Sequence, residues 1–346
     1  PYNKYGGQLR PPKKIKLIYT LYLTNPVNLD LIKSIACICV VGLHTVSMNN
    51  YTLYYLCDCG VPLFFMVNGY LLLSREQADY RYVFHKIAHI LKIVLSWNFL
   101  IAIPVLIFRQ KMINPFRLAF NSLLQKGYLW HFWFFGSLII IYLFLPVFHR
   151  MFFEKKRFHR AACLVFMGIC FCMSVLSIIK GYPLSMFIPQ PLRLWTWVFY
   201  FLAGGLFAVE NQKIQQFPIS IHGILLLFFT LFSNIAEKKV GLYLVHSRLA
   251  EYFYDNLFSI VWYCLLFTFL LRIPIKASYG VWISRFSRLT MGIFIIHPIL
   301  LFALNTRITP VGTISVLSFW LGLTLLSLLI GYVMDKIPVV RELIRL

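Results

Sequence analysis

The sequence predicts an all-α fold, a polytopic bundle of about ten transmembrane helices. First, 60% of the residues are hydrophobic and the mean hydropathy is +0.75, which is more apolar than soluble domains usually are. Second, the chain contains many uncharged windows of about 20 residues, the helical length that crosses the hydrocarbon core of a bilayer. Third, most Lys and Arg residues lie between these windows rather than inside them.

Taken in order, ten apolar segments are expected to span the membrane. They lie between a basic tail at 1–28 and a C-terminal tail at 335–346, so that the bundle covers 29–334. The segments are 29–48, 53–73, 90–108, 132–149, 161–179, 194–209, 218–235, 255–271, 289–304 and 314–334. With both termini in the cytoplasm, the inner segments hold 21 Lys and Arg residues and the outer segments hold 10. This bias, densest at 150–160, favours a cytoplasmic position for both tails.

Composition also excludes several classes of protein. The net charge of +22 is explained by the basic loops of a membrane protein, and the sequence contains no nucleic-acid-binding motif. Most of the eight cysteines lie in apolar spans, where thiols usually act as small hydrophobic groups. Cys57 and Cys59 flank an Asp, but no second cluster has metal-ligand spacing, so no metal is expected. The first span is too long and too polar for a cleavable signal peptide.

The first span carries a polar stripe. Lys33 and His44 are eleven residues apart, which is about three helical turns, so they share a face and are separated by roughly 16 Å along the axis. Asp30 lies three residues before Lys33, within reach of an ion pair. Ionisable residues inside a membrane helix are costly and usually face a protein interior or a watery cavity. The stripe therefore predicts a lined chamber, with His44 as a candidate base.

Five segments, in the same order along the chain, resemble the integral-membrane acyltransferase family 3. They are NLDLIKSIACICVVGLH (28–44), VPLFFMVNGYLL (61–72), LLQKGYLWHFWFFGSLIIIYLFLPVF (123–148), FYFLAGGLFA (199–208) and RLTMGIFIIHP (288–298). The resemblance implies that His44 is catalytic, with Asp30 and Lys33 in the same site, although Lys33 stands where the family usually has Arg. Lys keeps the positive charge but lacks the planar guanidinium with which Arg binds a carboxylate or a phosphate through two parallel hydrogen bonds. The alternative is that His44 is a packing residue bonded to a neighbouring helix.

The same resemblance implies that two further motifs bind substrates. Asn68 precedes Gly69 where the family usually has Ser, and it can still form hydrogen bonds; simple helix packing is the alternative. His131 and Trp133 match a family motif and are expected to contact an acceptor sugar, unless they belong to an aromatic belt at the interface. His297 lies within the ninth span and is a candidate partner of the donor or the base.

A basic stretch opens the third span. Lys86, His89 and Lys92 recur every three residues near the inner surface, where the family commonly has Arg-x-x-Arg. By resemblance this stripe is expected to bind the phosphates of coenzyme A, with Arg75 sharing the role. Ordinary anchoring by positive charge is the alternative.

The resemblance implies a multi-pass enzyme of the bacterial inner membrane. It is expected to move an acetyl group from cytoplasmic acetyl-coenzyme A to a sugar hydroxyl of a lipid-linked or surface polysaccharide. Histidine suits this reaction because its ordinary pKa, about 6.5, lets it take a hydroxyl proton. The expected partners are membrane lipid, a glycan acceptor and the acyl donor. A non-enzymatic exporter or flippase of glycan lipids, or a scaffold subunit, are the alternatives; neither requires coenzyme A.

Overall fold

The computed structural model describes residues 26–46, 50–110, 113–305 and 310–346, and it confirms a polytopic helical bundle. Most of the basic tail expected at 1–28 lies outside the described residues. The longer helices are α2 (Pro26–Thr45), α3 (Tyr51–Cys57), α4 (Gly60–Leu73), α5 (Tyr80–Arg109), α6 (Pro115–Leu123), α7 (Trp133–Leu143), α8 (Leu145–Glu154), α9 (Lys156–Lys180), α10 (Leu194–Val209), α11 (Asn211–Gln216), α12 (Ile219–Lys239), α13 (Leu257–Leu270), α14 (Ala277–Ser287), α15 (Thr290–Asn305) and α16 (Thr313–Lys336). Short helical turns are η1 (Trp130–Phe132), η2 (Leu184–Phe187), η3 (Gln190–Leu192), η4 (Val240–Leu244), η5 (Ala250–Tyr252) and α17 (Pro338–Arg341).

By length and composition, six helical segments of the described chain can cross a membrane, and eight can if each of two bent helix pairs is one span. Two more of the ten expected spans correspond to α10 and α13, which are apolar but shorter, with 16 and 14 residues. Which side of the bundle faces the cytoplasm remains a prediction from the Lys and Arg bias.

Several expected boundaries change for identifiable reasons. Helix α5 begins at Tyr80 rather than at residue 90, because Asp79 caps it by accepting a hydrogen bond from the Tyr82 N–H (2.9 Å). The expected span 132–149 is bent by 55° between η1–α7 and α8, beside Pro146 in the first turn of α8. The expected span 53–73 is divided into α3 and α4 at Asp58 and Cys59. A hydropathy pattern does not mark such breaks, because the apolar run continues through them.

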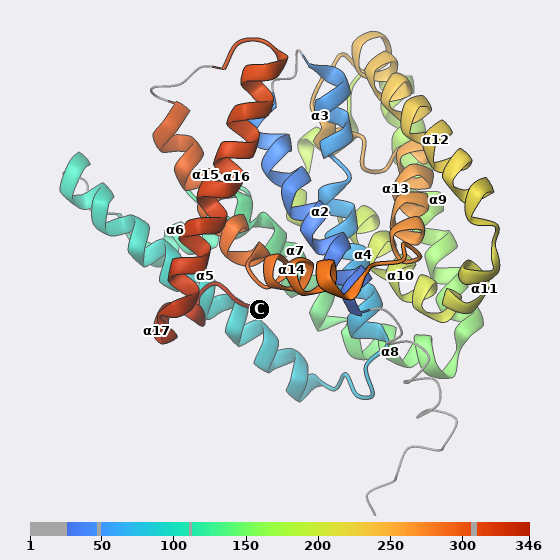
Figure 1. Cartoon of the computed structure of the whole chain (residues 1–346), viewed down its shortest axis with the longest axis horizontal. Helices are drawn as coiled ribbons and strands as arrows, with labels where there is room; N and C mark the ends of the chain where they lie inside the picture. Colours follow the sequence, from blue (N-terminus) through green and yellow to red (C-terminus); the bar gives the residue numbers. More distant parts are fainter. Residues whose placement is uncertain (1–25, 47–49, 111–112, 306–309) are drawn as a thin grey trace, which may run out of the picture.

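Helix α2 is the centre of the bundle. It packs against α3, α4, α13, α14, α15 and α16, and in Figure 1 it lies between α16 on one side and α4 and α13 on the other. The α3–α4 segment is 78% buried, whereas the α9 and α12 segments are each 11% buried. Helices α9 and α12 therefore face outward, and the most apolar surface of the bundle is left to the lipid. The buried α2 and α3–α4 segments are the ones that can line an internal cavity.

Helices α4 and α10 cross at close range through two glycines. A Cβ atom placed on Gly69 would lie 1.8 Å from the carbonyl oxygen of Phe201, and one on Gly204 would lie 2.0 Å from that of Met66. Each glycine thus meets the backbone of the opposite helix, the small-residue contact typical of membrane bundles. This crossing is a close helix approach at Gly69, and it fixes the position of Asn68 beside it.

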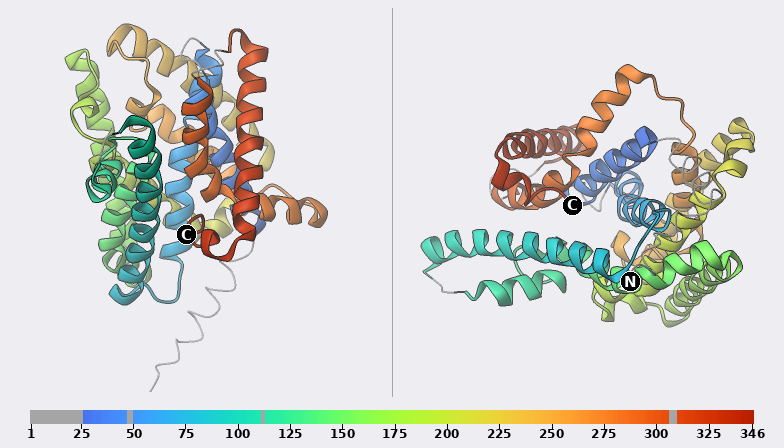
Figure 2. Two further views of the ribbon diagram at one scale, coloured as in Figure 1. Left: turned by 90° about the vertical axis from the view of Figure 1, so that its left-hand side faces the viewer. Right: turned by 90° about the horizontal axis from the view of Figure 1, so that it is seen from below.

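Helix α14 lies across the direction of the long helices, as Figure 2 shows beside α16. It is bent by 53° from α15, which follows it after a short break. At the same end of the bundle, Glu210, which directly follows α10, forms ion pairs with Arg160 at the start of α9 and with Lys213 of α11 (2.8 Å). The hydrogen bond from Lys213, aided by Arg160, lowers the pKa of Glu210 below its usual value.

Candidate active site

A cavity of about 1200 Å³ extends along the inside of the bundle. Its walls come from α2, α4, the start of α5, η1 and α7, the loop around η5, and α14–α15. Seven residues predicted from the sequence line it: Lys33, His44, Asn68, Arg75, Lys86, His131 and Trp133. The shared face predicted for Lys33 and His44 is therefore turned toward a chamber.

The two ends of the cavity differ in chemistry. Because α2 runs upward and α4 returns downward in Figure 1, Lys33 lies at the same end as Arg75 and Lys86. We call this end, lined by Lys33, Arg75, Lys86, Arg288 and Arg345, the basic end. The other end, where α2 finishes, is called the histidine end.

At the histidine end, His44 is held between two aromatic rings. The Trp130 ring lies nearly perpendicular to it, at an interplanar angle of 88° and a centroid distance of 5.0 Å, and the ring of His297 stacks on it at 5.4 Å with an interplanar angle of 20°. His44 is half-buried and lines the cavity. These contacts restrict the orientation of the imidazole while leaving it accessible from the chamber.

Two more histidines complete this end. His297 is fully buried, and its Nδ1 lies 2.9 Å from the Ile293 carbonyl oxygen, whereas its Nε2 has no hydrogen-bond partner. His131 is buried beside it, at a ring distance of 6.1 Å, and neither of its nitrogens has a hydrogen-bond partner. Within the described residues, no group of three or more His, Cys, Asp or Glu side chains could hold a metal ion. The rings of His44, His131 and His297 come from η1 and from helices α2 and α15, and their ring distances bring them together at one end of the cavity. The sequence alone does not show this clustering.

At the opposite end, the expected ion pair of α2 is present. Lys33 Nζ lies 2.6 Å from Asp30 Oδ1. The Asp30 carboxylate also accepts hydrogen bonds from Ser284 (2.7 Å) and Ser287 (2.8 Å) of α14. Asp30 thereby ties α2 to the crossing helix and orients Lys33 toward the cavity. Fourteen residues of helix, roughly 21 Å, separate Asp30 from His44, so the two side chains do not touch.

The three residues of the predicted basic stripe on α5 do not all face the cavity. Lys86 lines the cavity, but His89 and Lys92 do not. His89 Nε2 lies 2.8 Å from the Arg345 carbonyl oxygen, and Lys92 pairs with Glu342 at 2.5 Å, both in the C-terminal segment. The reason is geometric: six residues turn a helix by about 600°, which places Lys92 about 120° away from Lys86.

Other cations take the place of His89 and Lys92. Arg75 lines the cavity next to Lys86, and its guanidinium stacks over the Tyr82 ring at 4.3 Å. Arg288 and Arg345 line the same end and were not predicted as site residues. Arg288 opens a segment that resembles the family, so a signal for it existed. Arg345 reaches the cavity from the C-terminal segment, which no sequence pattern connects with α2.

Asn68 contributes a polar link in the middle of the cavity. Its Nδ2 donates to the Phe64 carbonyl oxygen (2.9 Å) of its own helix, and its Oδ1 accepts a hydrogen bond from the Tyr142 hydroxyl (2.9 Å). Both residues line the cavity, and Tyr142 was not predicted. The bond joins α4 to α7, so Asn68 has a packing role together with its position on the chamber wall.

Comparison with known proteins identifies the family. The model described as "Acyltransferase domain", that of acyltransferase family 3, matches residues 27–336. This range nearly coincides with the bundle predicted at 29–334. Comparisons with curated proteins and with solved structures gave no match. The family match, the apolar helices and a histidine-lined internal cavity agree with one another, and the chain belongs to the membrane acyltransferase family 3.

Proposed function

We propose that this acyltransferase moves an acetyl group from cytoplasmic acetyl-coenzyme A to a sugar hydroxyl of a lipid-linked or surface polysaccharide in the bacterial inner membrane. One observation carries the proposal: a single cavity joins a cluster of cations to His44. Within the family, the five motifs most resemble the O-acetyltransferase of enterobacterial common antigen synthesis. That resemblance supports the acetyl group and the glycan acceptor.

The basic end suits the donor. Coenzyme A carries several phosphate charges, which Lys and Arg side chains bind by charge-assisted hydrogen bonds. Arg75, Lys86 and Arg288 line this end and come from three different segments. Lys33 is held nearby through Asp30. Coenzyme A is too highly charged to enter lipid, so the cavity offers its thioester arm a polar route to the histidine end.

The histidine end suits the transfer step. His44 takes the proton of the acceptor hydroxyl while that oxygen attacks the carbonyl carbon of the thioester. The C–O bond of the acetyl ester forms, the C–S bond breaks, and the coenzyme A sulfur leaves with the proton returned by His44. The stacked ring of His297 and the perpendicular ring of Trp130 keep the imidazole in one orientation during both proton transfers. A covalent acetyl-His44 intermediate would use the same geometry.

Acetyl analysis of surface glycans tests the proposal. Cells that produce the protein should carry ester-linked acetyl groups that are absent from otherwise identical cells without it. When cells are fed labelled acetate, the label should appear in those esters. Unchanged acetylation, with altered amounts of glycan at the cell surface, would instead identify an exporter.

A further inference from the structure

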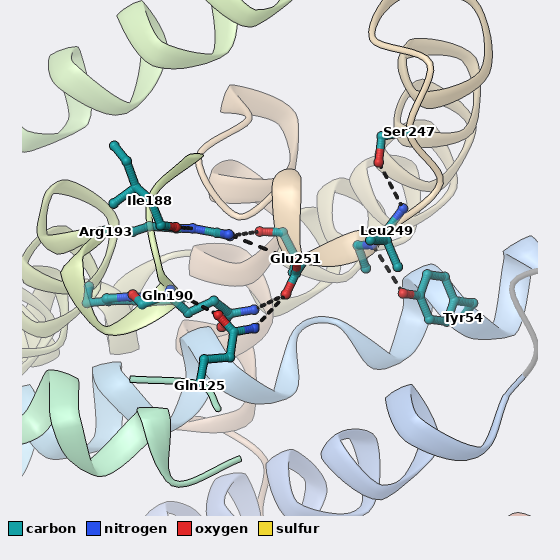
Figure 3. A network of polar contacts seen from close by, with 10 residues as sticks. Tyr54, Gln125, Ile188, Gln190, Arg193, Ser247, Leu249 and Glu251 are labelled. Atoms are coloured by element: carbon teal, nitrogen blue, oxygen red, sulfur yellow. Dashed lines mark hydrogen bonds and ion pairs between the residues drawn. The ribbon is translucent and has the colours of Figure 1, made fainter. Parts of the chain in front are cut away.

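A polar network surrounds Glu251 at the histidine end of the cavity (Figure 3). The Glu251 carboxylate accepts hydrogen bonds from the side-chain amides of Gln190 and Gln125, the latter at 3.3 Å. Arg193 donates to the backbone carbonyl oxygen of Glu251 at 2.8 Å, and its guanidinium lies 4.0 Å from Oε1. Three loop segments far apart in the sequence thus hold one carboxylate in a fixed position.

The network lies beside the proposed reaction centre. Gln125 precedes η1, which carries Trp130 against His44. The Ala250 N–H, next to Glu251, donates to the Tyr54 hydroxyl at 3.2 Å, and Tyr54 lines the same cavity close to the end of α2. Glu251 and Gln190 both line the cavity as well. They share its wall with His44 rather than with the basic end.

Some acceptor groups in this network have no partner. Gln190 is 4% exposed, yet its Oε1 forms no hydrogen bond, although the Nε2 of the same amide donates to Glu251. A carboxylate offers about four lone-pair sites; on Glu251 the two amides both use Oε2, and the Arg193 guanidinium lies 4.0 Å from Oε1. A buried acceptor left unpaired costs free energy that a hydroxyl donor would recover. The site therefore offers two oxygen acceptors to a ligand that carries hydroxyl groups.

Charge narrows the class of ligand. Among the described residues that line the cavity, Glu251 has the only acidic side chain, and it lies opposite the basic end. A ligand with its own carboxylate at this position would face a like charge, which is strongly unfavourable in a partly buried site. Trp130 and Trp133 line the same region, and the apolar faces of indole rings suit the C–H surfaces of a sugar ring; Trp133 is 6% exposed and packs against Trp197, so Trp130 is the more accessible of the two.

Building on the proposed function, we propose that Glu251 and Gln190 bind hydroxyl groups of the acceptor, and that the sugar residue that receives the acetyl group is uncharged. Glu251 Oε1 and Gln190 Oε1 each accept a hydrogen bond from a sugar hydroxyl, and the Glu251 carboxylate repels uronic acids. Gln125 and Arg193 act as positioning residues that hold Glu251 in place.

The test uses the purified full-length protein with radiolabelled acetyl-coenzyme A. The acceptor probes are octyl glycosides of glucose, galactose, mannose and N-acetylglucosamine, each compared with octyl glucuronide and octyl galacturonide. The wild-type protein should acetylate at least one neutral glycoside at least tenfold more efficiently than either uronide. Glu251→Gln should raise the half-saturating concentration of that glycoside roughly tenfold or more and weaken the preference against uronides. Its half-saturating acetyl-coenzyme A concentration should stay unchanged.

Two further variants keep the test decisive. Glu251→Asp retains the charge but shortens the side chain, so it should weaken glycoside binding and still exclude uronides. Glu154→Gln removes an exposed carboxylate outside the cavity and should behave as wild type. The proposal is overturned if the wild type accepts uronides as well as neutral glycosides, if it acetylates cell glycans but none of the neutral probes, or if Glu251→Gln leaves acceptor saturation unchanged. Absence of any acetyl transfer by the wild type would instead reject the proposed function.

Discussion

Replacing Gly69 with Ala should destabilise the whole bundle, because the added methyl group meets backbone rather than a movable side chain. The Cβ would lie 1.8 Å from the Phe201 carbonyl oxygen, and contacts below 3.0 Å essentially do not occur. Helices α4 and α10 would have to separate by about 1.2 Å along their most extensive contact. Overpacking of a core typically costs about 1–3 kcal/mol, and a rigid backbone on both sides places this case at or above about 3 kcal/mol.

The measurement is the thermal unfolding temperature of the detergent-purified protein. A loss of about 3 kcal/mol corresponds to a decrease of about 4 °C in a chain of 346 residues. Gly168→Ala is the matched control, since Gly168 is in the middle of α9 and its added Cβ would meet no atom within 4 Å. Alanine is the better helix former, so this control should be as stable as wild type or more so. Equal stability of the two variants would refute the close crossing of α4 and α10.

Three other predictions follow from the cations and the loops. Arg75→Ala combined with Lys86→Ala should raise the half-saturating acetyl-coenzyme A concentration at least tenfold, whereas Lys92→Ala should change it less than threefold; equal effects would contradict the position of the basic end. The lowered pKa of Glu210 means that its ion pairs stabilise the fold above its usual pKa of 4.5 and that this contribution is lost as the pH falls through the lowered value. The difference in unfolding temperature between wild type and Glu210→Gln should therefore be present at pH 7 and disappear in acid, and a difference independent of pH would argue against the pairing. Finally, a reporter fused within 150–160 should be cytoplasmic, and an external signal would invert the proposed sides of the cavity.

Residues on one regular helix were predictable. Lys33 and His44 line one chamber because their spacing is close to a whole number of helical turns, and the Asp30 ion pair follows from a spacing of three. Gly69 is compatible with either a close helix approach or a bend, and only the crossing with α10 decides between them. Where the spacing departs from whole turns the side chains separate: Lys86 lines the cavity, whereas Lys92 pairs with Glu342.

The rest of the site depends on long-range contacts that a periodic pattern does not encode. Glu251 and Gln190 lie in loops, and their pairing with Gln125 joins three segments separated by 60 residues or more. His297 was a candidate because of its position in an apolar span, but its stacking on His44 depends on how α15 packs against α2. Local sequence thus predicts which faces are polar, and packing decides which of those faces meet.

The central claim is that His44 is the base that receives the acceptor proton. The most direct measurement is the transfer of label from acetyl-coenzyme A to glycan by His44→Gln, compared with wild type at equal amounts of monodisperse membrane protein. Glutamine keeps polarity and approximate size but cannot take the proton at neutral pH, so we predict a loss of about 10²–10⁴ in rate with an unfolding temperature close to that of wild type. Transfer within a few-fold of wild type would contradict the account.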